Sequence, residues 1–155
     1  RAFFQVQQYF VESHLNFVGD GPMRGELEGE IERLGCGDSV TVHGHLTDPF
    51  QVLMRTDVFV LPSLAEGTPR AALEALHCGV PCILGNVDGN VELIEADENG
   101  WLVDDSFSLV QALRRAIEGG QIIGNRRSLL PASHRQQTCV SEHRRLFSRL
   151  MSGDA

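Results

Sequence analysis

The sequence lacks the features that would place it in a membrane or on a secretory route. No apolar run approaches the roughly 18 residues that a membrane-spanning helix needs. No signal peptide is recognisable, because the first residues (1–4) lead directly into a glutamine-rich stretch. The chain does not begin with Met, so we expect it to be a piece or processed form of a longer protein.

Cysteine is scarce, with four residues in a chain of 155, and no two of them have C-x2-C spacing. The histidines also lack the spacing of a zinc site, so no metal site is expected. Cys78 and Cys82 flank a predicted helix-to-strand turn with apolar neighbours. We expect ordinary buried thiols there, because a free cysteine usually behaves as a small core hydrophobe. Such usage is typical of a reducing cytoplasm.

Basic residues are outnumbered, since 13 Lys and Arg face 21 Asp and Glu, and the formal net charge is -8. Non-specific binding of nucleic acid or of an anionic membrane needs clustered cations, so both are disfavoured. An anionic ligand would have to be bound locally, for example at a helix N-terminus. The hydrophobic fraction of 42% and the length fit one compact domain with a real core.

Short apolar runs alternate with helix-like segments along most of the chain. The expected strands are residues 14–18, 39–43, 57–62, 81–84 and 101–103. The expected helices are residues 2–11, 23–34, 48–55, 69–78, 91–96, 106–118 and 133–151. Gly35 and Gly79 are expected to end two of these helices, and Ser106 to cap another.

This alternation predicts an α/β fold, a single Rossmann-like domain with a doubly wound parallel sheet and helices on both faces. Ligands of such folds bind beyond the carboxyl ends of the strands. The loops expected to line the site are therefore residues 19–23, 43–48, 62–70 and 85–92.

The loop after the third expected strand has the composition of an anion site. Gly67 lets the backbone approach a ligand closely. Thr68 can cap the following helix, with Pro69 at its first position. The free N–H groups of Thr68, Arg70 and Ala71 would then present the positive end of the helix dipole, which suits a diphosphate.

Two carboxylates, Glu66 and Glu74, flank this strand-to-helix turn eight residues apart. A carboxylate can accept hydrogen bonds from a vicinal diol, so carboxylates on both sides of an anion site suggest a ligand with central phosphates and terminal hydroxyls. A nucleotide sugar has this form. The alternative is a surface acid at Glu66 and a helix salt bridge between Glu74 and Arg70.

Four segments in order resemble the C-terminal, donor-binding domain of the GT-B glycosyltransferases of family 4, the "glycosyl transferases group 1". Their patterns are Phe17-Val-Gly-Asp-Gly-Pro22, Leu61-Pro-Ser-x-x-Glu-Gly67, Leu73-Glu-Ala-Leu-x-x-Gly-Val-Pro81 and Asn99-Gly-Trp-Leu-Val103. The resemblance covers residues 14–104. Because four blocks agree in order and spacing, it is far more specific than a lone Glu-x7-Glu motif.

The resemblance implies a role for each matching residue. Glu66 would act on hydroxyls of the transferred sugar as the catalytic carboxylate, and Glu74 would hold the ribose. The base is expected at main-chain groups near Leu46, and the turn with Gly19 and Gly21 would line the nucleotide side. The positions expected near the sugar and the distal phosphate are Gly67, Thr68, Pro69 and Arg70.

The same resemblance implies the reaction. A sugar would pass, with retention at its anomeric carbon, from a UDP-, GDP- or ADP-sugar to a glycan or lipid-linked acceptor. No cofactor or metal is expected, since the helix dipole and basic residues would stabilise the leaving diphosphate. The implied setting is synthesis of cell-surface polysaccharide or glycolipid in the cytoplasm, with contact to the inner face of the membrane through another domain.

One part of the family pattern is not in the sequence. The family's donor domain opens with a strand followed by an Arg and a Lys that clamp the diphosphate, and these would precede Arg1. The N-terminal acceptor domain is likewise outside residues 1–155. We therefore expect a partial donor site and no turnover by this chain alone. The basic segment 133–151 would either cross to the other domain or pack on its own sheet.

Two other functions are open on the sequence. The chain could be a non-catalytic nucleotide-sugar-binding module, or a related GT-B enzyme such as a nucleotide-sugar epimerase. An epimerase would need catalytic carboxylates and histidines that the Glu-x7-Glu pattern does not supply. His43 and His45 lie near the expected cleft, but we expect hydrogen-bonded structural roles for them. The turn formed by residues 88–92 could line the sugar side, and Trp101 is expected in the core or at a domain contact.

Overall fold

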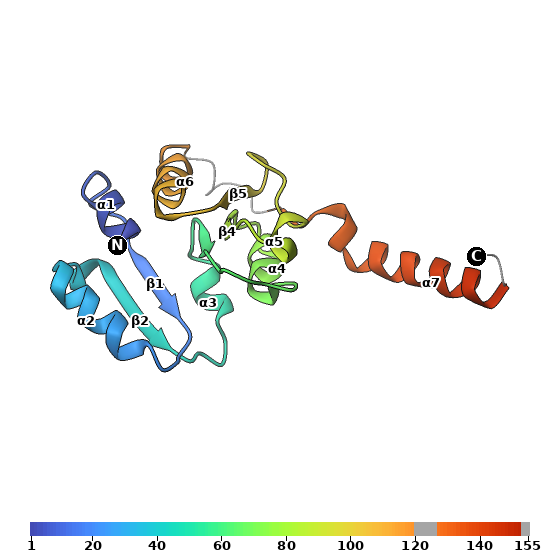
Figure 1. The fold of residues 1–155 in the computed structure, drawn as a ribbon, viewed down its shortest axis with the longest axis horizontal. Helices are drawn as coiled ribbons and strands as arrows, with labels where there is room; N and C mark the ends of the chain where they lie inside the picture. The colour runs from blue at the N-terminus through green and yellow to red at the C-terminus, as the bar shows by residue number, and fades with distance from the viewer. Residues whose placement is uncertain (120–126, 153–155) are drawn as a thin grey trace.

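The computed structural model describes residues 1–119 and 127–152 and alternates helices with parallel strands (Figure 1). The strands are β1 (Leu15–Val18), β2 (Val40–Gly44), β3 (Phe59–Leu61), β4 (Cys82–Gly85) and β5 (Gly100–Val103). The helices are α1 (Ala2–Gln7), α2 (Arg24–Leu34), α3 (Phe50–Leu53), α4 (Arg70–His77), α5 (Asp88–Val91), α6 (Ser106–Glu118) and α7 (Gln136–Ser152). Two 3₁₀ turns, Gly37–Ser39 and Ala132–His134, complete the order. The predicted α/β class is confirmed.

The strands form two parallel sheets rather than the single sheet expected from the sequence. β1 pairs with β2, and β3, β4 and β5 form a separate sheet in that order. In the described residues no backbone hydrogen bond joins β1 to β3, so each of these strands has one open edge. Helix α3 lies on the connection from one sheet to the other.

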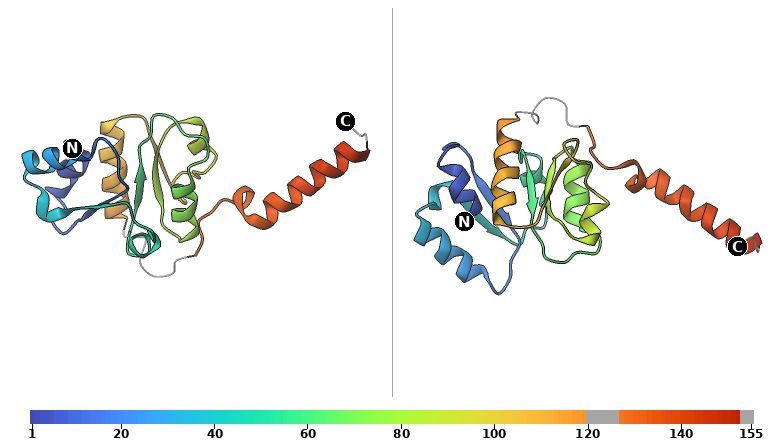
Figure 2. Two further views of the ribbon diagram at one scale, coloured as in Figure 1. Left: turned by 90° about the horizontal axis from the view of Figure 1, so that it is seen from below. Right: turned by 45° about the horizontal axis from the view of Figure 1, so that its top comes forward.

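The core is built around β4, whose four residues are all buried. Cys82 and Leu84 pack in one cluster with the α4 residue Leu76, whereas Ile83 packs in a second cluster with Val6 of α1 and residues of α6. Alternate residues of a strand point to opposite faces, so β4 alone divides the two clusters. Figure 2 shows the sheet between α4 and α6, which is the doubly wound arrangement.

The β1–β2–α2 unit has much less core. No residue of α2 is buried, and on β1 Phe17 and Val18 are 37% and 44% exposed. Apolar side chains on a parallel strand are normally covered on both faces. This unit therefore has apolar surface that the described residues leave open.

Helix α5 begins three residues earlier than predicted and ends at Val91, so the expected helix 91–96 is wrong. The buried side chain of Asn99 explains the difference. Its Oδ1 accepts from the Glu95 N–H at 2.8 Å and its Nδ2 donates to the Leu93 carbonyl at 2.9 Å. These bonds hold residues 93–95 in a loop, because a side chain that satisfies backbone groups competes with the helix. Helices α1 and α3 are also shorter than predicted, whereas Gly35 and Gly79 end α2 and α4 with positive φ as expected.

The C-terminal helix α7 starts at Gln136, after a 3₁₀ turn that occupies the first expected positions. Figures 1 and 2 show it extending away from both sheets. Packing of this segment on its own sheet is therefore wrong, while a contact with another domain stays a prediction. None of the helices in the described residues is long and apolar enough to cross a membrane.

Helix α6 is capped by Asp105 and not by Ser106 as the sequence suggested. The Asp105 Oδ1 accepts from the Ser108 N–H at 2.7 Å, and the Ser108 hydroxyl oxygen accepts from the Asp105 N–H at 3.0 Å, forming a capping box. The hydrogen bonds from the backbone N–H and hydroxyl of Ser108 lower the pKa of Asp105. Ser106 instead occupies the first helical position.

We therefore expect Asp105→Ala to lower the midpoint of urea unfolding at neutral pH, and Ser106→Ala to leave it nearly unchanged. A carboxyl group with a lowered folded pKa contributes stability that is present above its unfolded pKa of about 3.9 and is lost as pH falls through the folded value. The deficit of Asp105→Ala should thus shrink in strong acid. Equal midpoints for the two variants at neutral pH would contradict the assignment.

Candidate functional site

The carboxyl ends of β1 and β2 bring together two of the loops expected to line the site. The N–H of Gly19 donates to the carbonyl of Gly44 at 2.8 Å, and Val18 pairs with Gly44 in the strand register. Both glycines have positive φ, 128° and 68°. The predicted nucleotide-side residues Gly19 and Leu46 therefore lie on adjacent loops, with Leu46 half-buried.

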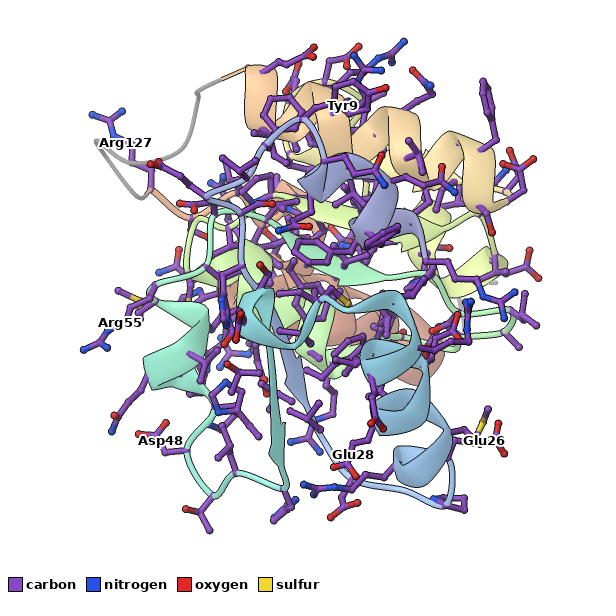
Figure 3. All side chains as sticks on the ribbon, turned by 90° about the vertical axis from the view of Figure 1, so that its left-hand side faces the viewer. Tyr9, Glu26, Glu28, Asp48, Arg55 and Arg127 are labelled. Atoms are coloured by element: carbon purple, nitrogen blue, oxygen red, sulfur yellow. The ribbon has the colours of Figure 1, made fainter. Side chains whose placement is uncertain are left out.

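Arg24 at the start of α2 is a residue of this edge that the sequence interpretation missed. Its Nε donates to Glu28 at 2.8 Å and its Nη1 to Asp20 at 3.4 Å, and these acids raise its pKa, the hydrogen bond to Glu28 most. The guanidinium covers Gly44, where a Cβ atom would come within 2.8 Å of Nη1. The sequence did contain a signal for this cluster, because one acid lies four residues before Arg24 and another lies four residues after it. Figure 3 labels Glu28 on α2, with Asp48 of the β2–α3 loop at the same lower edge.

Glu66 and Glu74 carry the carboxylates of the second half of the site, and both are half-buried. Among the side chains that the structure describes, neither carboxylate has a hydrogen-bond or ion-pair partner. The alternative salt bridge between Arg70 and Glu74 is accordingly absent there. Partly buried carboxylates without partners keep their acceptor capacity for a ligand.

The N-terminus of α4 differs by one residue from the prediction. Pro69 is the N-cap, with extended backbone (φ -72°, ψ 105°) and no side-chain cap, so Thr68 does not cap and Pro69 is not the first helical residue. The first N–H bonded to a carbonyl is that of Ala72, to Pro69 at 3.1 Å. The N–H groups of Arg70 and Ala71 come before that of Ala72, in the first turn, where backbone N–H groups have no acceptor within the helix. The expected anion-binding end is thus formed by these two groups without a cap.

The β3–α4 loop lies directly against helix α5. A Cβ atom at Gly89 would overlap the carbonyl oxygen of Gly67 and reach within 2.7 Å of that of Glu66. The structure therefore brings Glu66, Gly67 and Gly89 together. In the described residues no hydrogen bond or ion pair joins this group to the Gly19 and Leu46 loops.

The other residues considered from the sequence are a histidine, the cysteines and Trp101, and their contacts are those of structural residues. His43 lies in β2 and its Nε2 is 2.8 Å from the Oδ1 of Asn16, in agreement with the hydrogen-bonded role expected for it. Cys82 is buried, and burial raises the pKa of its thiol, while none of the four cysteines forms a disulfide bond. A cavity of about 240 Å³ near Trp101 lies at the opposite end of β4 and β5, where the indole N–H donates to Asp97 at 3.0 Å.

No group of three or more His, Cys, Asp or Glu side chains in the described part of the chain is placed to hold a metal ion. The expectation of a metal-independent site stays a prediction.

The two glycines of the β1–α2 turn should differ when replaced by alanine. Gly19 has a φ that side chains rarely adopt, so Gly19→Ala should lower the free energy of unfolding by about 1–3 kcal/mol. Gly21 has an ordinary φ and nothing within 4 Å of a built Cβ, so Gly21→Ala should be neutral or slightly stabilising. Urea unfolding of both variants checks this, and equal losses would contradict the described turn.

Comparison with known proteins agrees with the fold. An Escherichia coli UDP-Gal:alpha-D-GlcNAc-diphosphoundecaprenol alpha-1,3-galactosyltransferase is 34% identical over 125 residues, which are 75% of this chain and 32% of that protein. The lipopolysaccharide outer core galactosyltransferase WaaB in its apo form has a TM-score of 0.66 at 26% identity, covering 76% of this chain and 35% of that one. The Anabaena protein HepE in complex with UDP has a TM-score of 0.72 at 24% identity, covering 98% and 43%.

The chain spans about a third or less of the length of the curated relatives it matches. Residues 1–119 match the family described as "Glycosyl transferases group 1", a region that contains every predicted site residue. The chain therefore belongs to the group 1 glycosyl transferases, and its fold is that of a GT-B glycosyltransferase domain.

Proposed function

We propose that residues 1–155 are the donor-binding domain of a retaining glycosyltransferase that moves a sugar from a nucleotide-diphosphate sugar to a glycan or lipid-linked acceptor. The observation that carries this proposal is the arrangement around α4. Two partly buried carboxylates, Glu66 and Glu74, have no partner among the described residues and flank a helix N-terminus without a side-chain cap.

The chemistry of each part fits a different part of such a donor. The N–H groups of Arg70 and Ala71 carry the positive end of the helix dipole and suit the diphosphate. When the sugar leaves, negative charge grows on that diphosphate, and fixed donors stabilise charge that develops in a transition state. Glu66 would accept hydrogen bonds from hydroxyls of the sugar, and Glu74 from those of the ribose.

The β1–β2 edge would hold the nucleoside. Its turn, with Gly19 and Gly21, leaves room for a ligand, and main-chain groups near Leu46 can bind a base edge. Arg24 adds a cation at this edge, although Asp20 and Glu28 already engage it. We therefore assign Arg24 to shaping the loop over Gly44 and not to binding phosphate.

The relatives support the substrate class. One is named for transfer of galactose from UDP-Gal to a lipid-diphosphate acceptor, another protein of the same fold was solved with UDP, and others are named for colanic acid and Vi polysaccharide synthesis. We accordingly propose a UDP-sugar before GDP- or ADP-sugars, and a cytoplasmic role in surface polysaccharide or lipopolysaccharide synthesis.

The open edges of β1 and β3 support a donor site completed from outside this chain. The order β2-β1-β3-β4-β5, with one further strand between β1 and β3, becomes the doubly wound order 3-2-1-4-5-6. We propose that a strand preceding Arg1 occupies this place and ends in the Arg and Lys expected from the family. Since ligands bind at the point where strand order reverses, those cations would face the α4 N-terminus.

A thermal-shift panel tests the donor site. UDP-galactose, UDP-glucose, UDP-N-acetylglucosamine, GDP-mannose and ADP-glucose are each added to the chain, and we expect a rise in Tm with one nucleotide class, because a ligand of the folded state stabilises it. Glu74→Gln should reduce the rise for both the sugar nucleotide and its nucleotide diphosphate. Glu66→Gln should reduce it mainly for the sugar nucleotide.

Glu32→Gln, at an exposed position on α2, is the matched control and should leave every shift unchanged. No shift with any member of the panel would contradict donor binding by this chain. Shifts that Glu74→Gln leaves intact would contradict the ribose assignment.

A longer version of the protein tests the completed site. If it begins about 20 residues upstream, so that one strand and its following loop are included, the affinity for the donor should rise by about tenfold to a hundredfold for each cation gained. That factor corresponds to roughly 1.5–3 kcal/mol for a charge-assisted hydrogen bond. Equal affinity of both versions, or glycosyl transfer by residues 1–155 alone, would contradict the proposal that the donor site is shared between this chain and a preceding segment.

A further inference from the structure

Two glycines, one at the end of β4 and one in α5, lie in direct contact with the β3–α4 loop. Gly85 is the last residue of β4, and a Cβ atom there would overlap the carbonyl oxygen of Ser63 and lie 3.1 Å from its nitrogen. Gly89 lies in α5, and a Cβ atom there would overlap the carbonyl of Gly67. Neither glycine has a positive φ, so both positions require glycine for space and not for conformation.

Hydrogen bonds connect α5 and the segment before it to Gly85. The side-chain Nδ2 of Asn90 donates to the carbonyl of Gly85 at 2.8 Å, and the N–H of Val87 donates to the same carbonyl at 2.9 Å. Asn90 is completely buried, and its Oδ1 has no hydrogen-bond partner among the described residues. A buried amide oxygen without a hydrogen bond costs free energy. The Asn90 side chain is therefore kept in this position by its one hydrogen bond to Gly85 and by the packing around it.

We propose that Gly85 and Gly89 are positioning residues. Because they have no side chains, they set how closely the backbone of Glu66 and Gly67 approaches β4 and α5, and Asn90 holds α5 in place. Glu66 has no side-chain partner in the described structure, so its carboxylate is located only through the backbone of this loop. A side chain at Gly89 would push the β3–α4 loop away from α5 and thereby move Glu66 relative to Glu74. The inference rests on the proposed function, because the position of Glu66 matters for the sugar end of the donor.

The first test needs no ligand. Gly89→Ala should raise the rate of amide hydrogen exchange across residues 63–69, whereas Gly100→Ala should not. Gly100 is the matched control, because its built Cβ would overlap the carbonyl of Cys82 in a similar way at the opposite end of the sheet. Gly25→Ala, with nothing within 4 Å of the new methyl group, controls for the substitution itself.

The second test separates the two ends of the donor. UDP-galactose, GDP-mannose and ADP-glucose are each compared with their own nucleotide diphosphate by calorimetry at a temperature where all variants are folded. In Gly89→Ala the additional affinity that the sugar contributes should fall by about tenfold to a hundredfold, because a displaced Glu66 carboxylate would no longer accept hydrogen bonds from the sugar hydroxyls. Affinity for the nucleotide diphosphate alone should change little, and Gly100→Ala should preserve both.

The outcomes distinguish the two proposals. If no nucleotide sugar binds the unchanged chain, the proposed function fails, while hydrogen exchange still decides whether Gly89 positions the loop. If Gly89→Ala and Gly100→Ala affect exchange of residues 63–69 equally, or if both ligand types weaken in parallel, the positioning role is wrong.

Discussion

Strand β4 is the constraint on which the rest of the structure depends. All four of its residues are buried, it is hydrogen-bonded on both edges, and its alternating side chains face two separate hydrophobic clusters. Helix α4 packs on one face, and α1 with α6 on the other (Figure 2). Because Gly85 ends this strand, the most buried strand of the described sheets also contacts the loop that carries Glu66.

This arrangement explains why the two halves of the candidate site differ. The Glu66–Glu74 half rests on a sheet with helices on both faces, so its geometry is fixed by packing. The β1–β2 half has apolar residues on its surface, such as Phe17 and Val18, and is joined to the other sheet through α3. We propose that a nucleotide sugar reaches from one half to the other, beside a strand added between β1 and β3.

The sequence predicted those features that depend on local pattern. The five strands are short apolar runs bounded by glycine, proline or acids, and Gly35 and Gly79 end helices because each adopts a positive φ. The matching motif blocks predicted the family, which the comparison confirmed.

Features that depend on distant contacts could not be predicted in this way. The loop at residues 93–95 depends on the buried Asn99, and the separation of the sheets depends on which strand edges meet. The contact of Gly89 with Gly67 joins residues 22 positions apart, and no periodicity in the sequence reports it. The cap of α6 was misassigned by one residue, since Asp105 and Ser106 are both good capping residues and only the geometry chooses between them.

The central claim is that one ligand is bound across the carboxyl ends of the strands, with its diphosphate at α4. The most direct measurement is a titration of the ¹⁵N-labelled chain with UDP-galactose, followed by the backbone amide shifts. The account predicts that the largest changes fall on residues 66–74, with smaller ones on the turns at residues 19–21, 44–46 and 85–90. Changes confined to the opposite end of the sheet, around Asp97 and Trp101, would contradict it.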